Sequence, residues 1–180
     1  MALKSIIYKA ELNISDMDRG YYADHNLTIA RHPSETDERM MVRVLAFAIH
    51  AAERLEFGKG ISDTEEPDLW EKDYTDAIQT WIEVGQPDDR RLLKACGRSE
   101  KVYVYSYASA SDVWWKQMNS RLDRAKNLSV RNIPAEQSQA LEKLAQRTMQ
   151  LQCTIQDGQI WLSAGEVSVQ IDVETLKDFA

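Results

Sequence analysis

The 180-residue sequence predicts an α+β fold, and three observations lead to it. Residues 5–15 and 149–173 alternate apolar and polar side chains, as half-buried strands do. Residues 79–107 have the pattern strand, helix, strand, which predicts a right-handed parallel crossover. The composition, 43% hydrophobic and 28% charged, is that of an ordinary globular protein with enough chain for a core. We therefore expect one domain over residues 1–180, with helices around the crossover and antiparallel hairpins at both ends.

The first predicted elements are a hairpin and a helix. Residues 5–15 and 21–31 are the two strands, and a turn over residues 16–20 joins them. The helix is expected to begin after Ser34, its predicted N-cap, and to run to about Arg54. Glu38 lies one turn before the apolar face of this helix. It either complements the positive end of the helix dipole or belongs to a site near that end.

The middle of the chain carries two further acids on a predicted hairpin. A short strand over residues 55–58 and a polar loop over 59–66 precede antiparallel strands at 69–72 and 79–85. Asp68 follows Pro67 at the start of the first of these strands, and Glu83 lies in the middle of the second. Acidic residues are depleted in strands and rarely buried without a partner. Glu83 therefore lies either on the exposed face of an edge strand or in a site.

The pair Asp68 and Glu83 has the layout of a two-carboxylate metal site. A Pro-Asp pair is followed, after a hairpin turn, by a glutamate on an apolar strand. Hard cations such as Mg²⁺ prefer oxygen ligands and usually take one or two protein carboxylates. Such an ion stabilises charge on a phosphoryl group.

A helix and a strand follow this hairpin and complete the predicted crossover. Pro87 is expected at the first helical position and Gly97 at the C-terminal cap. The helix carries three cations, Arg90, Arg91 and Lys94. The next strand is 102–107, and ligands of such units gather at the carboxyl ends of the strands, where Glu83 and Gly85 lie.

The rest of the chain is expected to be scaffold. It contains a helix over 111–125, a strand over 128–130 and a helix that starts at Pro134. A C-terminal meander follows, with a type I′ turn at Asp157-Gly158 and a last strand that reaches Val173.

Composition also excludes several classes of protein. A net charge of −7 argues against a protein that coats nucleic acid, because that task needs many cations. No apolar run has the roughly 20 residues of a membrane span, and the N-terminus alternates and predicts no targeting segment. Cys96 and Cys153 lack metal-ligand spacing, so we expect them to be reduced and buried. These features favour a cytoplasmic protein without a membrane partner.

Five segments of the sequence resemble the YaeQ family, over essentially the whole chain. They read RHPSETDERMM, EPDLW, WIEVGQPDDRR, LLKACG and TIQDGQIWLS. The resemblance implies a divergent branch of the PD-(D/E)XK nuclease-like superfamily, with a restriction-endonuclease-like core: a mixed central sheet flanked by helices, with added hairpins. It implies a site in which Glu38, Asp68 and Glu83 bind Mg²⁺ or Mn²⁺.

One position departs from the superfamily pattern. The lysine expected two residues after the strand acid falls at Gly85, and glycine cannot polarise water. Either a cation of the next helix replaces it, with Lys94 as first choice and Arg90 or Arg91 behind it, or the site is inactive. Three functions therefore stay open. They are a metal-dependent nuclease acting on DNA or RNA, a non-catalytic module that binds nucleic acid or a protein, and an adaptor whose acids are structural.

Overall fold

The computed structural model describes residues 4–180, which form two compact units. The N-terminal unit comprises the chain up to Ala48 together with Glu136–Asp172, and the central unit comprises Ile49–Ala135 and Val173–Ala180. Each unit contains one mixed β-sheet, so the predicted α+β class is confirmed. One domain over residues 1–180 stays a prediction.

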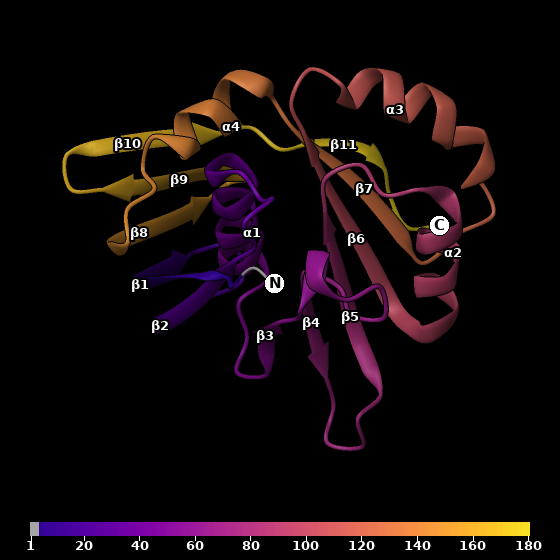
Figure 1. Ribbon diagram of the computed structural model, residues 1–180, viewed down its shortest axis with the longest axis horizontal. Helices are drawn as coiled ribbons and strands as arrows, with labels where there is room; N and C mark the ends of the chain where they lie inside the picture. The colour runs from indigo at the N-terminus through magenta and orange to yellow at the C-terminus, as the bar shows by residue number, and fades with distance from the viewer. Residues whose placement is uncertain (1–3) are drawn as a thin grey trace. The chain divides into compact units, whose positions relative to one another are not determined.

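The sheet of the N-terminal unit joins both predicted hairpins. Its strand order is β10-β9-β8-β1-β2 (Figure 1). All neighbours are antiparallel except β1 and β8, which run parallel. The alternating patterns thus predicted the strands, but not the parallel pair that unites the two ends of the chain. The bounds are β1 Ile6–Asp16, β2 Tyr21–Arg31, β8 Thr148–Gln156, β9 Gln159–Ala164 and β10 Val167–Ile171.

One face of this sheet is buried against helix α1 (Asp37–His50). The inward residues of β1, such as Leu12 and Ile14, are 1% exposed. The ring of Phe47 on α1 meets the ring of His25 on β2 edge to face at 5.1 Å. The opposite face of the sheet carries the exposed polar residues of the alternating pattern. A second helix of this region, α4, spans Ala135–Glu142.

Helix α1 is shorter at both ends than the sequence predicted. Its first turn is capped by Thr36, whose Oγ1 accepts a hydrogen bond from the Arg39 amide at 3.1 Å. Ser34 is not the cap, because its hydroxyl bonds to His32 Nδ1 at 2.6 Å in the preceding turn. The helix ends at His50 instead of Arg54.

The sheet of the central unit has the order β11-β7-β6-β5-β4-β3. The first three strands in sequence are antiparallel, and β5, β6 and β7 are parallel neighbours, which confirms the predicted crossover. Glu83 therefore lies on a strand between two others and not at an edge. The bounds are β3 Leu55–Phe57, β4 Leu69–Lys72, β5 Ile78–Val84, β6 Ser99–Tyr107, β7 Leu128–Ile133 and β11 Glu174–Lys177.

The prediction that the final meander strand reaches Val173 was wrong. Strand β10 ends at Ile171, and the following β11 pairs with β7 in the central unit. The backbone amide of Asp172 donates to the side chain of Gln137 at 2.7 Å. Because this amide is taken by a side chain, the β ladder stops there.

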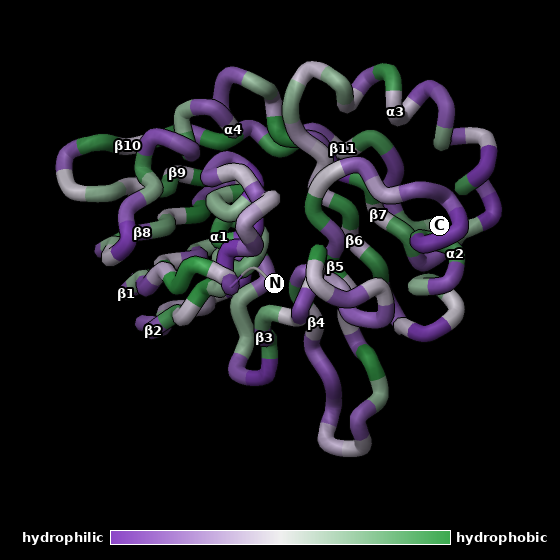
Figure 2. The backbone as a smooth tube through the Cα atoms, in the orientation of Figure 1, coloured by the Kyte–Doolittle hydropathy of each residue, from purple (hydrophilic) through white to green (hydrophobic). Residues whose placement is uncertain are grey.

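Helices α2 (Asp89–Arg98) and α3 (Ser111–Met118) pack on one face of the central sheet. Figure 2 shows hydrophobic segments along β6 and β7 and a largely hydrophilic α2. The predicted helix over 111–125 is broken after Met118 by a 3₁₀ turn, Asn119–Arg121. A second 3₁₀ turn, Gly60–Ser62, lies between β3 and β4. The core comprises Trp81, Leu92, Ala95, Val102, Val104, Trp114, Leu122, Ala125, Leu128 and Val130.

The ends of α2 also differ from the prediction. Asp88 is the N-cap, and its Oδ1 accepts a hydrogen bond from the Arg91 amide at 2.8 Å. Pro87 thus precedes the cap, where its carbonyl accepts a bond from the Trp114 indole at 2.8 Å. Gly97 lies inside the last turn instead of capping it.

Both cysteines are free thiols. Burial raises the pKa of Cys153 to about 12 and that of the partly buried Cys96 to about 11, which disfavours the reactive thiolate at both positions. No helix within residues 4–180 is long and apolar enough to cross a membrane.

Candidate carboxylate site

The central unit brings Asp68 and Glu83 together on neighbouring strands. Asp68 directly precedes β4, and the antiparallel pairing of Leu69 with Ile82 places it beside Glu83 on β5. Asp68 is 1% exposed and Glu83 is 4% exposed. Because carboxylates are rarely buried without compensation, the contacts of this pair decide what it does. The alternative in which Glu83 lies on an exposed face is wrong.

Asp68 is fixed by backbone on two sides. Its Oδ2 accepts a hydrogen bond from the Val84 amide at 2.8 Å, and its carbonyl accepts one from the Gly58 amide at 3.0 Å. A Cβ on Gly60 would lie 2.5 Å from Asp68 Oδ1, and Gly60 has a φ of +52°. Glycine is thus required at this position both by its backbone conformation and by the approach of the carboxylate.

Glu83 is held through one of its oxygens by two donors. Oε1 accepts a hydrogen bond from the Trp81 indole at 2.9 Å and another from Arg91 Nε at 2.7 Å. Burial, and next the negative charge of Asp68, raises the pKa of Glu83 to about 7, although Arg91 and the indole bond act against this rise. At neutral pH this carboxyl is therefore partly protonated, unlike an ordinary glutamate.

Arg91 connects Glu83 to the loop before β4. Its Nη1 donates to the Thr64 carbonyl at 2.9 Å and its Nη2 to the Glu66 carbonyl at 3.0 Å. The planar guanidinium thus uses three nitrogens, one on Glu83 and two on the loop. From the sequence, Arg91 was only a second choice, behind Lys94, for the cation at this site.

The other three cations of α2 do not contact Glu83. Lys94, which the sequence placed first, donates to Glu65 Oε1 at 2.9 Å, and its side chain is 60% exposed. Arg98 joins the same exposed glutamate at 3.4 Å. Arg90 is exposed on the helix surface. Among the three cations predicted for the site, Arg91 is the one placed on Glu83.

The backbone conformation at Gly85, where the resemblance led us to expect a lysine, favours glycine. Its φ is +110°, and its amide donates to the Tyr105 carbonyl at 2.9 Å. A Cβ there would meet no atom within 4 Å. Space is therefore available, but L side chains rarely adopt this backbone conformation.

Glu38, the third predicted acid, belongs to the N-terminal unit. It lies in the first turn of α1, and its Oε2 accepts a hydrogen bond from Ser138 Oγ at 2.8 Å. The structure thus groups Asp68, Glu83 and Arg91 within one unit, whereas the role of Glu38 as a metal ligand stays a prediction.

The chemistry of the pair fits a hard divalent cation, although it offers few ligands. Within residues 4–180, no group of three or more His, Cys, Asp or Glu side chains is arranged to hold a metal ion. Two carboxylates are nevertheless the number that Mg²⁺ commonly takes from a protein, with water and substrate phosphate in the remaining positions.

Fold and site together define an α+β protein with two mixed sheets and a buried carboxylate pair. Residues 1–173 match the family described as YaeQ protein. The chain is 45% identical over 174 residues to the uncharacterized protein YaeQ of Escherichia coli strain K12, and 47% identical over 174 residues to that of Salmonella typhi. Each of these alignments covers 96% of both chains.

Solved structures give the same assignment. The crystal structure of the YaeQ protein from Xanthomonas axonopodis pv. citri matches with a TM-score of 0.93 and 47% identity, covering 97% of this chain and 99% of that one. The crystal structure of the YaeQ protein from Pseudomonas syringae matches with a TM-score of 0.90 and 39% identity, covering 96% of each. The chain therefore belongs to the YaeQ family.

Proposed function

We propose that Asp68 and Glu83 bind a divalent metal ion, Mg²⁺ or Mn²⁺, and that the protein hydrolyses phosphodiester bonds of DNA or RNA at this site. The observation that carries the proposal is the burial of two carboxylates side by side. Placing a second acid beside a buried one lowers the stability of the fold. Carboxyl groups whose pKa is shifted in this way are common at functional sites. A divalent cation would offset the repulsion between the two acids.

The topology of the central unit supports the same proposal. Strands β3, β4 and β5 form an antiparallel series, and a parallel crossover through α2 leads to β6. A mixed sheet with helices beside it is what the restriction-endonuclease-like core requires. In such a core, Asp68 at the start of one hairpin strand and Glu83 on the next would be the Pro-Asp and strand acids. Membership of the PD-(D/E)XK superfamily is part of this proposal.

Each residue of the cluster has a defined task in the proposed reaction. The Val84 amide and the Trp81 indole orient the two carboxylates, so that little reorganisation accompanies cation binding. Arg91 presents a planar guanidinium, which matches the geometry of a phosphate as well as that of a carboxylate. A bound Mg²⁺ would supply Lewis-acid stabilisation of charge on the phosphoryl oxygens.

Access to the site depends on the loop before β4. The pair is nearly inaccessible, and Arg91 ties the carbonyls of Thr64 and Glu66 beside it. Lys94 adds an exposed ion pair to Glu65 of the same loop. A polynucleotide therefore reaches the carboxylates only after this loop has moved away from α2.

A specific observation favours a second function, a non-catalytic module that binds nucleic acid or a protein. Glu83 Oε1 and Asp68 Oδ2 already accept internal hydrogen bonds, and Gly85 supplies no side chain. In that case the cluster would hold the loop and α2 in place and would catalyse no reaction.

Calorimetric titration with Mg²⁺ and Mn²⁺ tests the proposal. We expect binding by the wild type and loss of most of it in Asp68→Asn and Glu83→Gln. Glu100→Gln is the matched control, because Glu100 is an exposed acid of the same unit. Glu38→Gln, in the same titration, tests the predicted third ligand.

Hydrolysis assays on single- and double-stranded DNA and RNA then separate the two functions. Metal-dependent cleavage that Asp68→Asn abolishes supports the nuclease. Metal binding without cleavage favours the non-catalytic module. Absence of any metal-dependent heat in the wild type contradicts the metal site itself.

A further inference from the structure

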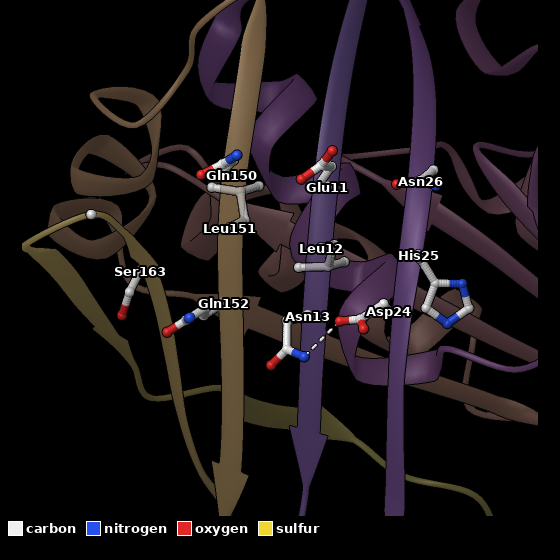
Figure 3. A pocket seen from close by; sticks show the side chains of 11 residues that line it. Glu11, Leu12, Asn13, Asp24, His25, Asn26, Gln150, Leu151, Gln152 and Ser163 are labelled. Atoms are coloured by element: carbon white, nitrogen blue, oxygen red, sulfur yellow. Dashed lines mark hydrogen bonds between the residues drawn. The ribbon is translucent and has the colours of Figure 1, made fainter.

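The outer face of the N-terminal unit's sheet contains a polar hollow of about 520 Å³ (Figure 3). This volume is in the range of small-molecule binding sites. The hollow lies across β2, β1, β8 and β9 and takes no part in the site proposed above. Its outward side chains are Glu11, Asn13, Asp24, Asn26, Gln150, Gln152 and Ser163.

Strand register arranges these side chains in two parallel rows. In one row, Asp24 is paired with Asn13, Asn13 with Gln152, and Gln152 with Ser163. In the other row, Glu11 lies between Asn26 and Gln150 (Figure 3). Paired residues of neighbouring strands project to the same side, so each row presents its polar groups together.

Within the first row, one contact fixes a pair of side chains. Asn13 Nδ2 donates to Asp24 Oδ1 at 2.6 Å. This bond orients the amide of Asn13 and leaves its oxygen as an acceptor beside Gln152. The hollow thus presents oriented donors and acceptors.

Aromatic residues occupy the two ends of the next row along the strands. There Tyr22 pairs with Ser15, Ser15 with Thr154, and Thr154 with Trp161. Tyr22 is 63% exposed, and Trp161 is partly exposed on the same face. The two rings are three strand spacings apart, about 14 Å. An ordinary solvent-facing sheet also carries polar side chains, but here they line a hollow with aromatic residues beside it.

The chemistry of the hollow restricts its ligand. The described residues that line it include two carboxylates and no lysine or arginine, which disfavours phosphates and nucleic acid. Leu12 and Leu151 contribute little apolar surface, because their side chains are 1% exposed and belong to the buried face. Amides and carboxylates together suit groups that both donate and accept hydrogen bonds, as sugar hydroxyls do.

We propose that this hollow binds a neutral oligosaccharide. Hydroxyl groups of the sugar bond to the two rows of amides and acids, and an exposed ring, Tyr22, packs on the apolar face of a sugar ring. The span between Tyr22 and Trp161 suits several linked sugars better than one.

Titration of the ¹⁵N-labelled protein with neutral tetrasaccharides tests this inference. The probes are the tetramers of β-linked glucose, α-linked glucose, mannose and N-acetylglucosamine. We expect at least one probe to cause saturable amide shifts on β1, β2, β8 and β9. Gln152→Ala and Tyr22→Ala should each weaken binding by about tenfold, the usual result of losing one good contact. Gln156→Ala, an exposed glutamine of the same strand outside the hollow, should bind as the wild type does.

Several results would overturn the inference. They are the absence of saturable shifts with all four probes at millimolar concentrations, shifts located on the central unit, and unchanged affinity in Gln152→Ala. Tight binding of spermine without binding of any sugar would also overturn it, because the two acids would then form only an anionic patch. The spectra show at once whether each variant is folded, so a loss of binding is not confused with unfolding.

Discussion

The carboxyl group of Glu83 should make the stability of the protein depend on pH, and the variant Glu83→Gln should lack this dependence. Glutamine has the same shape, keeps an oxygen for the Trp81 indole, and carries no charge. The comparison therefore isolates the cost of ionising one buried carboxyl beside Asp68.

The sign and size of the effect follow from the pKa of Glu83. It rises from 4.5 in the unfolded chain to about 7 in the folded protein. Between these two values the unfolded chain loses the proton and the folded protein keeps it, so the free energy of unfolding falls as the pH rises. The fall begins near pH 4.5 and ends near pH 7. A difference of roughly 2.5 pKa units corresponds to about 3 kcal/mol.

Two measurements check this prediction. Urea unfolding of wild type, Glu83→Gln and the control Glu100→Gln, at a series of pH values from about 4.5 to 8.5, gives the free energies. The gap between wild type and Glu83→Gln should change by about 3 kcal/mol in favour of the variant. The indole N–H signal of Trp81, which donates to Glu83, should titrate near pH 7 in the wild type only.

The reasoning is refuted by either of two results. One is a pair of parallel stability curves for wild type and Glu83→Gln over this pH range. The other is an indole signal of Trp81 that titrates below pH 5, because the carboxyl would then be ionised throughout the neutral range despite its burial, or a signal that does not titrate, because Glu83 would then keep one protonation state.

Three further predictions concern the same cluster. Arg91→Met should lower the free energy of unfolding by about 3 kcal/mol at pH 8, because it leaves the charge of Glu83 buried without a partner. At pH 5, where Glu83 is protonated, the loss should be smaller. Urea unfolding at both pH values measures the two losses, with Arg91→Lys as the comparison that keeps a positive charge. Gly60→Ala should cost about 2 kcal/mol and weaken metal binding, because its Cβ would meet Asp68 Oδ1 at 2.5 Å. Gly158→Ala is its control, since that position has a φ of +76° with no neighbour within 4 Å, so it should cost about 1 kcal/mol and leave metal binding unchanged. The affinity for Mn²⁺, measured by calorimetry, should rise about tenfold per pH unit up to pH 7 and level off above it, because metal binding requires ionised Glu83. A constant affinity from pH 6 to 8 contradicts the proposal that Glu83 is a metal ligand.

Local patterns in the sequence predicted most strands and singled out two acids, Asp68 and Glu83, that the structure buries together. The alternation in residues 5–15 marks β1 because every second side chain meets the core. Glu83 stood out for a similar reason, as a charged residue inside an apolar strand. Both are properties of a short window of sequence, which is why no distant contact was needed to predict them.

Contacts between distant residues were beyond such reasoning. The parallel pairing of β1 with β8 joins residues about 140 positions apart, and no local pattern encodes its register. The choice among the cations of α2 depends on the rotation of the helix about its axis. Leu92 and Ala95 are buried against the sheet, and this orientation brings Arg91 to Glu83 while Lys94 remains at the surface. Because this rotation could not be known from the sequence, Lys94 was expected at the site ahead of Arg90 and Arg91.

The direction of the chain after Glu83 explains why a helix arginine, and not a residue of the strand, contacts this acid. Strand β5 ends at Val84, and Gly85, with a φ of +110°, turns the chain toward α2. Arg91 lies in the first turn of that helix, where its amide donates to the Asp88 cap and its side chain donates to Glu83. An arginine neutralises charge but does not give up its proton, whereas a lysine can exchange one. In the proposed site, the group that gains or loses a proton near neutral pH is therefore Glu83. Arg91 supplies the positive charge that would bind a phosphate.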